Sequence, residues 1–254
     1  LLLEEPVLGE HVALRAEASL TSTPNDGQTV SAEIVRTDGA ADRLIAEFTR
    51  SALGEIEGRA SAQTDANSSL AQLAYATGRG FTLDADISGD AQSGAADFVF
   101  TIGEQTGLQG QGRWQDGDWF LDAQTNAEAW PALPSSVRAL LSGGSLSGQG
   151  ELDPRSGELR FSSEAGEIIA VRSNSPEITV SGTLNSAGLA LVIPEQVTVG
   201  QARLDARYNP EGEEDWLTGQ LQAEGVAHPQ MRLEALQAQF VLTRDPQGYR
   251  FDVD

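Results

Sequence analysis

The sequence contains no cysteine and only two histidines, His11 and His228. Without cysteine the chain forms no disulfide and no thiolate metal site, and such a composition is compatible with an oxidising compartment of a cell envelope. Neither histidine lies in a metal-binding or triad-like pattern, so we interpret both as ordinary surface or turn residues. The nucleophile elbow, the phosphate-binding loop and the dinucleotide fingerprint are also missing. The sequence therefore predicts a protein that is not an enzyme, with no catalytic residue, metal site or cofactor.

Positive charge is scarce, and long apolar runs are absent. Lysine and arginine number 16 against 38 aspartates and glutamates, so the formal net charge is -22. Binding to nucleic acid needs basic patches, and so does an extended contact with an anionic membrane surface; the composition argues against both. We interpret the acidic surface as a means of keeping repetitive strands soluble. No window approaches the roughly 18 apolar residues of a membrane-spanning helix.

The amino terminus also lacks the charged region and apolar run of a signal peptide. Both ends of the sequence read as strands, so we expect the chain to be a segment of a longer protein, with any targeting signal or anchor outside it.

Aromatic residues make up only 6% of the chain, and hydrophobic residues 39%. This favours a thin interior, as in repeat proteins whose units contact only their neighbours. A repeated pattern is present: an apolar residue, any residue, glycine, any residue, then a small or apolar residue. It occurs at Ile56–Ala60, Leu108–Gly112, Leu146–Gly150, Val180–Leu184 and Leu217–Leu221. The last four of its glycines are 38, 34 and 37 residues apart, and such near-constant spacing is typical of a repeat architecture.

Within each repeat the apolar residues alternate with polar ones. From Val12 to Leu20, for example, every second residue is apolar, which is the period of a half-buried strand. Turn residues interrupt this alternation every 8 to 12 residues, and we count roughly 16 to 18 short strands. The sequence therefore predicts an all-β, antiparallel fold, with residues 1–254 as a single elongated β-repeat segment.

Two short helices interrupt the strand period, near residues 68–77 and 135–142. Each has an N-cap candidate, three-and-four apolar spacing and a terminal glycine. Such a helix either covers a sheet end or acts as a lid over an apolar groove. The strand glycines also have two explanations: they permit the bending of a sheet, or they allow a neighbouring sheet or ligand to approach the backbone. We favour bending.

Two pairs of carboxylates, Asp84 with Asp86 and Asp116 with Asp118, resemble the beginning of a calcium site. A calcium loop needs more oxygen ligands at fixed offsets, so we interpret these carboxylates as turn or outer-face residues.

Two stretches carry a family resemblance. Residues Glu5–Glu10 lead into the alternating strand Val12–Leu20, and Ile34–Gly39 closes a hairpin before another alternating strand. Together with the glycine-punctuated strands, these stretches make the chain similar to the long β region of the TamB family, the translocation and assembly module subunits of Gram-negative envelopes. The wider group includes AsmA-like and bridge-like lipid-transfer proteins. The resemblance implies a periplasmic sheet curled lengthwise into a trough (a β-taco), apolar inside and polar outside.

The resemblance also implies a full-length protein anchored in the inner membrane and an outer-membrane barrel partner like TamA, contacted through regions outside this segment. It implies that the trough moves phospholipid between the inner and outer membranes, with acyl chains on an inward apolar stripe. The residues expected to face inward are Leu14, Leu20, Ile34, Phe48, Phe81, Leu83, Phe98, Phe100, Leu121, Phe161, Val180, Leu191, Leu204, Leu221 and Phe240.

Two other functions stay open at this stage. A periplasmic scaffold would assist outer-membrane β-barrel assembly by offering a sheet edge to client strands, without carrying lipid. An extracellular adhesin or carbohydrate binder would need exposed aromatic platforms. It ranks last, because the four tryptophans, Trp114, Trp119, Trp130 and Trp216, lie mostly near turns.

Overall fold

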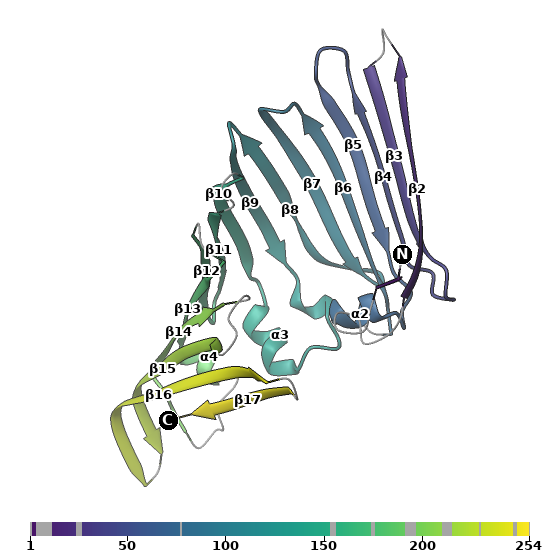
Figure 1. Cartoon of the computed structure of the whole chain (residues 1–254). Helices are drawn as coiled ribbons and strands as arrows, with labels where there is room; N and C mark the ends of the chain where they lie inside the picture. Colours follow the sequence, from purple (N-terminus) through teal and green to yellow (C-terminus); the bar gives the residue numbers. More distant parts are fainter. Residues whose placement is uncertain are drawn as a thin grey trace. The chain divides into compact units, whose positions relative to one another are not determined.

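The computed structural model describes residues 2–3, 12–23, 27–76, 78–152, 156–173, 176–190, 197–209, 215–228, 230–245 and 248–253. The fold is all-β and antiparallel, and the sheet is not closed into a barrel (Figure 1). The predicted fold class is therefore confirmed. Residues Glu5–Glu10, on which part of the family resemblance rests, lie outside the described residues, and so does His11.

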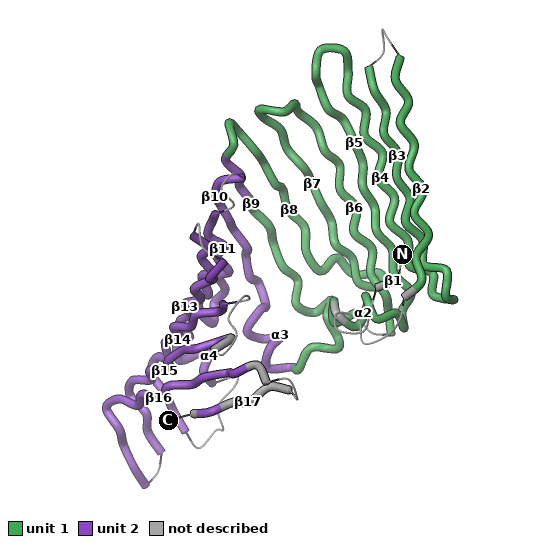
Figure 2. Tube along the Cα trace, in the orientation of Figure 1, with its two compact units in different colours: residues 1–117, 121–134 green, residues 118–120, 135–254 purple. Residues whose placement is uncertain are grey.

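Contacts between residues divide the chain into two compact units (Figure 2). Unit 1 comprises residues 1–117 and 121–134, and unit 2 comprises residues 118–120 and 135–254. Strand β9, Asp118–Thr125, is shared between them. The described elements of unit 1 are β1 Leu2–Leu3, β2 Val12–Thr23, β3 Gly27–Arg36, β4 Arg43–Arg50, β5 Ile56–Gln63, α2 Ser69–Leu73, β6 Phe81–Gly89, β7 Ser93–Ile102, β8 Gln105–Gln115 and the 3-10 helix η1 Ala127–Ala129.

The elements of unit 2 continue this plan. They are α3 Ser135–Leu141, β10 Ser145–Glu151, β11 Ser156–Ser163, β12 Gly166–Arg172, β13 Ile178–Asn185, α4 Ser186–Ala190, β14 Gln201–Tyr208, β15 Asp215–His228, β16 Met231–Asp245 and β17 Gly248–Val253.

Strand pairing follows chain order within each unit. In unit 1, pairing runs without interruption from β1 with β2 to β7 with β8. In unit 2 it runs from β10 with β11 to β16 with β17. Each described pair is antiparallel. Because every strand finds its partners among its sequence neighbours, no second sheet folds back within these pairings to cover either face.

Both predicted helices are present, as α2 and α3. Helix α2 is shorter than its predicted range, and its N-cap is Ser68, whose Oγ accepts a hydrogen bond from the Ala71 amide at 3.1 Å; serine at this position stabilises a helix start. Within the described residues, no helix is long and apolar enough to cross a membrane.

A third helix, α4, lies where the sequence pattern predicts a turn and a strand through Leu189, Leu191 and Ile193. That prediction is wrong for Leu189, which is buried in α4. The side chain of Asn185 accepts a hydrogen bond from the Gly188 amide at 3.0 Å and so caps this helix. Leu191 and Ile193 lie outside the described residues.

A buried ion network joins β3 to the start of α2. The Arg36 guanidinium lies 3.4 Å from Asp42 and is paired with Asp38. The hydrogen bond that the Arg36 guanidinium donates to Asp38 lowers the pKa of the Asp38 carboxyl group. Asp42 is 4% exposed and also accepts a hydrogen bond from the Asp65 amide at 2.8 Å. The network fixes the loop that leads into α2.

Replacing Asp42 with alanine should therefore destabilise the protein by about 3 kcal/mol, because it leaves a buried guanidinium short of a partner and a buried amide without an acceptor. Denaturant unfolding measures this cost. The control is Asp86→Ala, which breaks the exposed Arg59–Asp86 pair and should cost less than about 1 kcal/mol. Equal costs for the two variants would show that the network has no special role.

Candidate functional site

One face of each unit is apolar along its whole width. Directly paired residues of an antiparallel sheet point to the same face, so the register defines rows of side chains that run across the strands. One row of unit 1 is Ala16, Ile34, Leu44, Ala62, Leu83, Phe100 and Leu108. One row of unit 2 is Leu146, Phe161, Ile168, Gly182, Leu204, Leu221 and Ala238. We call the face that carries these rows the apolar face of its unit.

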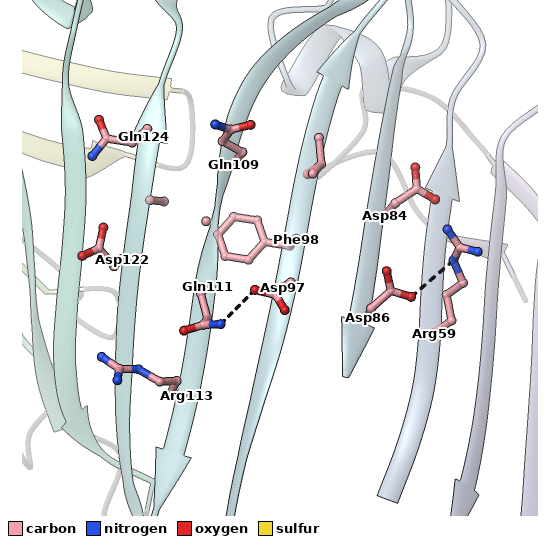
Figure 3. A pocket seen from close by; sticks show the side chains of 13 residues that line it. Arg59, Asp84, Asp86, Asp97, Phe98, Gln109, Gln111, Arg113, Asp122 and Gln124 are labelled. Carbon is pink, nitrogen blue, oxygen red and sulfur yellow. Dashed lines mark hydrogen bonds and ion pairs between the residues drawn. The ribbon is translucent and has the colours of Figure 1, made fainter. Parts of the chain in front are cut away.

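The opposite face is polar. In unit 1 its rows include Ser19, Ser31, Glu47, Arg59, Asp86, Asp97 and Gln111. Figure 3 shows a hollow with such residues, where Arg59 lies 3.6 Å from Asp86 and the Gln111 amide donates a hydrogen bond to Asp97 at 2.9 Å. Charged side chains of this kind keep the polar face compatible with water.

The register places thirteen of the fifteen predicted inward residues on the apolar face of their unit. Leu121 is assigned to the apolar face through Ala123, which lies two residues further along β9 and so points to the same face. The Cβ of Ala123 lies where a Cβ on Gly110 would point, and Gly110 belongs to the apolar face. The fifteenth, Leu191, lies outside the described residues. Whether these side chains contact lipid stays a prediction.

Little of the apolar face is buried. Leu20 is 67% exposed, and Val30, Leu44 and Leu221 are also exposed. Among the described residues, Ile102 is the one large side chain that is fully buried. The chain exposes 16267 Å², whereas a compact globule of its mass would expose about 11,000 Å², and two separate globules of half that mass about 13,000 Å². The residues of the two apolar rows are themselves half-buried or exposed, and none of them is fully buried.

At one end of unit 1, a small cluster does cover the apolar face. Helix α2 and η1 contribute Ala71 and Ala129, which pack on Ile102, and Phe81 and Phe100 pack against the same cluster. Trp130 completes it: its indole stacks on Phe100 with ring centroids 6.0 Å apart and donates a hydrogen bond to the carbonyl of Ala74 at 3.1 Å. Helix α2 therefore covers a sheet end, which is the first of the two roles that the sequence predicts for the short helices.

Helix α3 lies over the apolar face of unit 2 and leaves space beneath it. The Ser163 hydroxyl holds the helix by donating a hydrogen bond to the carbonyl of Leu140 at 2.8 Å. Between helix and sheet is a cavity of about 240 Å³, which we call the α3 cavity. Its apolar lining comes from Val137, Leu140 and Leu141 of α3 and from Phe161, Ile168, Leu184, Ala202, Leu204 and Leu221 of the sheet; Ser163, Gly166, Glu167, Gly182 and Thr183 complete it. Here the helix combines both predicted roles, because it covers the sheet and closes over an apolar groove.

Next to this cavity, α4 forms a second buried cluster. Leu189 packs with Val199, Ala202 and Ala223, and Leu184 joins them from the edge. Ala202 and Leu184 also line the α3 cavity, so α4 closes one side of the region that contains it.

The recurring glycines make room for side chains of adjacent strands. A Cβ on Gly58 would collide with the ring of Phe48, and one on Gly219 with the ring of Phe240; both rings belong to the directly paired residues. This cause is separate from bending, which stays a prediction. Gly182 differs, because a Cβ there would meet its nearest neighbours, Glu167 and Ile168, only at 3.5 Å. The space above Gly182 is part of the α3 cavity.

Among the described residues, neither carboxylate pair considered for calcium gathers further ligands. Asp84 and Asp86 lie on the polar face of β6, and Figure 3 shows the neighbouring carboxylates of Asp97 and Asp122 on separate strands. Within the described residues, no group of three or more histidines, aspartates and glutamates is placed to hold a metal ion. His228 ends β15 rather than lying in a turn, as the sequence suggests.

The sequence pattern did not identify the α3 cavity. The spacing of Val137, Leu140 and Leu141 was visible and identified the apolar side of α3. The sequence does not show that the space above Gly182, beneath that helix, is empty, because this glycine has the same sequence pattern as the other glycines of the repeat.

The two kinds of strand glycine should respond differently to one added methyl group. Gly58→Ala should destabilise the protein by about 1–3 kcal/mol, because the Phe48 ring must move. Gly182→Ala should cost nothing and could add up to about 1 kcal/mol by restricting the unfolded chain. Urea unfolding of both variants measures the difference. A loss of stability in Gly182→Ala as large as that in Gly58→Ala would mean that no free space lies above Gly182.

Comparison with known proteins leaves the family resemblance untested. No protein-family model, no curated protein and no solved structure matches the chain. The similarity to the TamB family therefore remains a prediction from sequence, and the function of the apolar face must be argued from its own chemistry.

Proposed function

We propose that the apolar face binds the acyl chains of phospholipids, and that this chain forms part of a conduit between the inner and outer membranes of a Gram-negative envelope. The observation that carries the proposal is the α3 cavity, an almost entirely apolar space open to a sheet face that is itself exposed. Contiguous exposed apolar surface of this kind normally marks a binding site.

The chemistry of the cavity favours an alkyl chain over a polar ligand. Its polar side chains are few, namely Ser163, Glu167 and Thr183, and Ser163 is already engaged with α3. An apolar cavity of about 150 Å³ stays free of water and binds small apolar molecules, and the α3 cavity is larger at about 240 Å³. Each methylene group buried there contributes about 0.8 kcal/mol to binding.

The repetition of the rows supports movement rather than fixed storage. Neighbouring strands present similar apolar side chains at the same register positions, so adjacent binding positions differ little in free energy. An acyl chain can then pass between them over small barriers. A periplasmic location, an inner-membrane anchor outside this segment and a TamA-like barrel partner belong to the same proposal, and their support is the family resemblance.

A scaffold for β-barrel assembly is the second candidate, and one observation favours it. Within the described residues, β2 pairs with β3 along Leu14–Thr23, while β1 covers only Val12 and Ala13 on its other side. An exposed strand edge is able to accept a client strand. This function predicts binding of unfolded barrel segments and no bound lipid.

Filling the α3 cavity separates these functions. Gly182→Leu places a side chain in the free space and should reduce bound phospholipid about tenfold, as counted by native mass spectrometry and lipid extraction of the same sample. The protein should stay folded, because no atom blocks the new Cβ. Thr179→Leu is the matched control, since Thr179 is exposed on the opposite face of the same strand.

Wild-type lipid content in a folded Gly182→Leu protein would show that the cavity is not the binding site. A wild-type protein that carries no lipid and takes up no fluorescent lipid would favour the scaffold instead.

A further inference from the structure

A second hollow in unit 2 combines an apolar floor with a positive charge. Its volume is about 460 Å³, and its apolar lining includes Trp119, Leu152, Leu159, Ala170 and Ile178. Leu152 and Leu159 are 51% and 41% exposed, so the floor is open to a ligand. Ser156, Gly157 and two charged residues, Arg172 and Glu151, complete the lining. We call this hollow the Arg172 site.

The floor is held rigidly by Trp119. Its indole nitrogen donates a hydrogen bond to the carbonyl of Ser156 at 3.2 Å. The ring lies over three glycines, Gly148, Gly150 and Gly157, whose missing side chains leave it room. An indole fixed in this way offers a flat apolar surface with little conformational entropy left to lose on binding.

Arg172 lies on the apolar face. It pairs with Gly157 on one side and Ile178 on the other, both on that face, and its side chain is exposed. Within the described residues, no carboxylate forms an ion pair with it, whereas Arg160 and Arg203 on the polar face both pair with acidic residues. Glu151 follows Gly150 in β10 and pairs with Ser156. Because successive residues of a strand alternate between faces, its strand position belongs to the polar face.

The Arg172 site and the α3 cavity lie on one line along β12. Ile168 lines the cavity, Ala170 and Arg172 line the Arg172 site, and the three residues alternate on the same face. At about 3.3 Å per residue, Ile168 and Arg172 are about 13 Å apart along the strand. A ligand lying along β12 therefore reaches both sites.

We propose that the Arg172 site binds the phosphate head group of an amphiphile whose alkyl chain runs along β12 toward the α3 cavity. The inference rests on the proposed function and adds an orientation and a head-group chemistry to it. A guanidinium donates paired hydrogen bonds that match phosphate oxygens. The exposed Arg172 guanidinium is therefore placed to pair with the anionic head of a ligand whose alkyl chain lies on the apolar face.

Calorimetric titration with dodecyl phosphate and with dodecanol, each below its aggregation threshold, tests the proposal. Arg172→Gln should weaken the binding of dodecyl phosphate about fivefold, as expected for an exposed charge pair, and should leave dodecanol binding unchanged. The control is Arg207→Gln, which makes the same change in net charge at an exposed residue of the polar face; it should leave both affinities unchanged.

Two results would overturn the inference while leaving acyl-chain binding intact. One is an equal weakening of dodecyl phosphate binding by both variants, which would reflect net charge alone. The other is competition by inorganic phosphate at concentrations near those of dodecyl phosphate, which would identify a site for free phosphate. Failure of the wild type to bind dodecanol as well would contradict the proposed function itself.

Discussion

The structure depends on one constraint: each strand pairs with its neighbours in the chain, and within each unit most large apolar side chains of the strands point to one face. Such a sheet stabilises itself through cross-strand contacts along its rows, yet within the described strand pairings no second sheet buries those rows. The small buried clusters, the exposed leucines and the α3 cavity all follow from this. Helix α2 covers part of the apolar face of unit 1, and α3 and α4 cover parts of the apolar face of unit 2.

The faces of the sheet were predictable from sequence because strand periodicity is strict. Alternation from Val12 to Leu20 and at Leu83 or Phe161 identifies which residues share a face, and the observed register agrees. Long-range consequences were not predictable. A glycine such as Gly58 has its cause in Phe48 on the paired strand, and α4 forms because Asn185 caps it within a sequence that also reads as a turn. The cavity over Gly182 depends on where α3 packs, which local sequence does not specify.

The two faces divide the chemistry of the chain. Acidic residues and ion pairs such as Arg59–Asp86 occupy the polar face, where they keep an open sheet soluble. The apolar face has few charges, and Arg172 is therefore informative about its ligand. An amphiphile satisfies both features, since its alkyl chain suits the rows and its anionic head suits the guanidinium. A lipid conduit would need the same division, with one face that contacts water and another that contacts the alkyl chain.

The most direct test compares two adjacent aliphatic residues of β4. Leu44 lies on the apolar face, opposite Ile34 and Ala62, while Ile45 lies on the polar face, opposite Glu33 and Ser61. The photoreactive residue benzoylphenylalanine, placed at either position and irradiated in cells, reports what each face contacts. Crosslinking of phospholipid from position 44 and not from position 45 is the predicted result. Equal crosslinking from both positions, or none from either, would contradict the account.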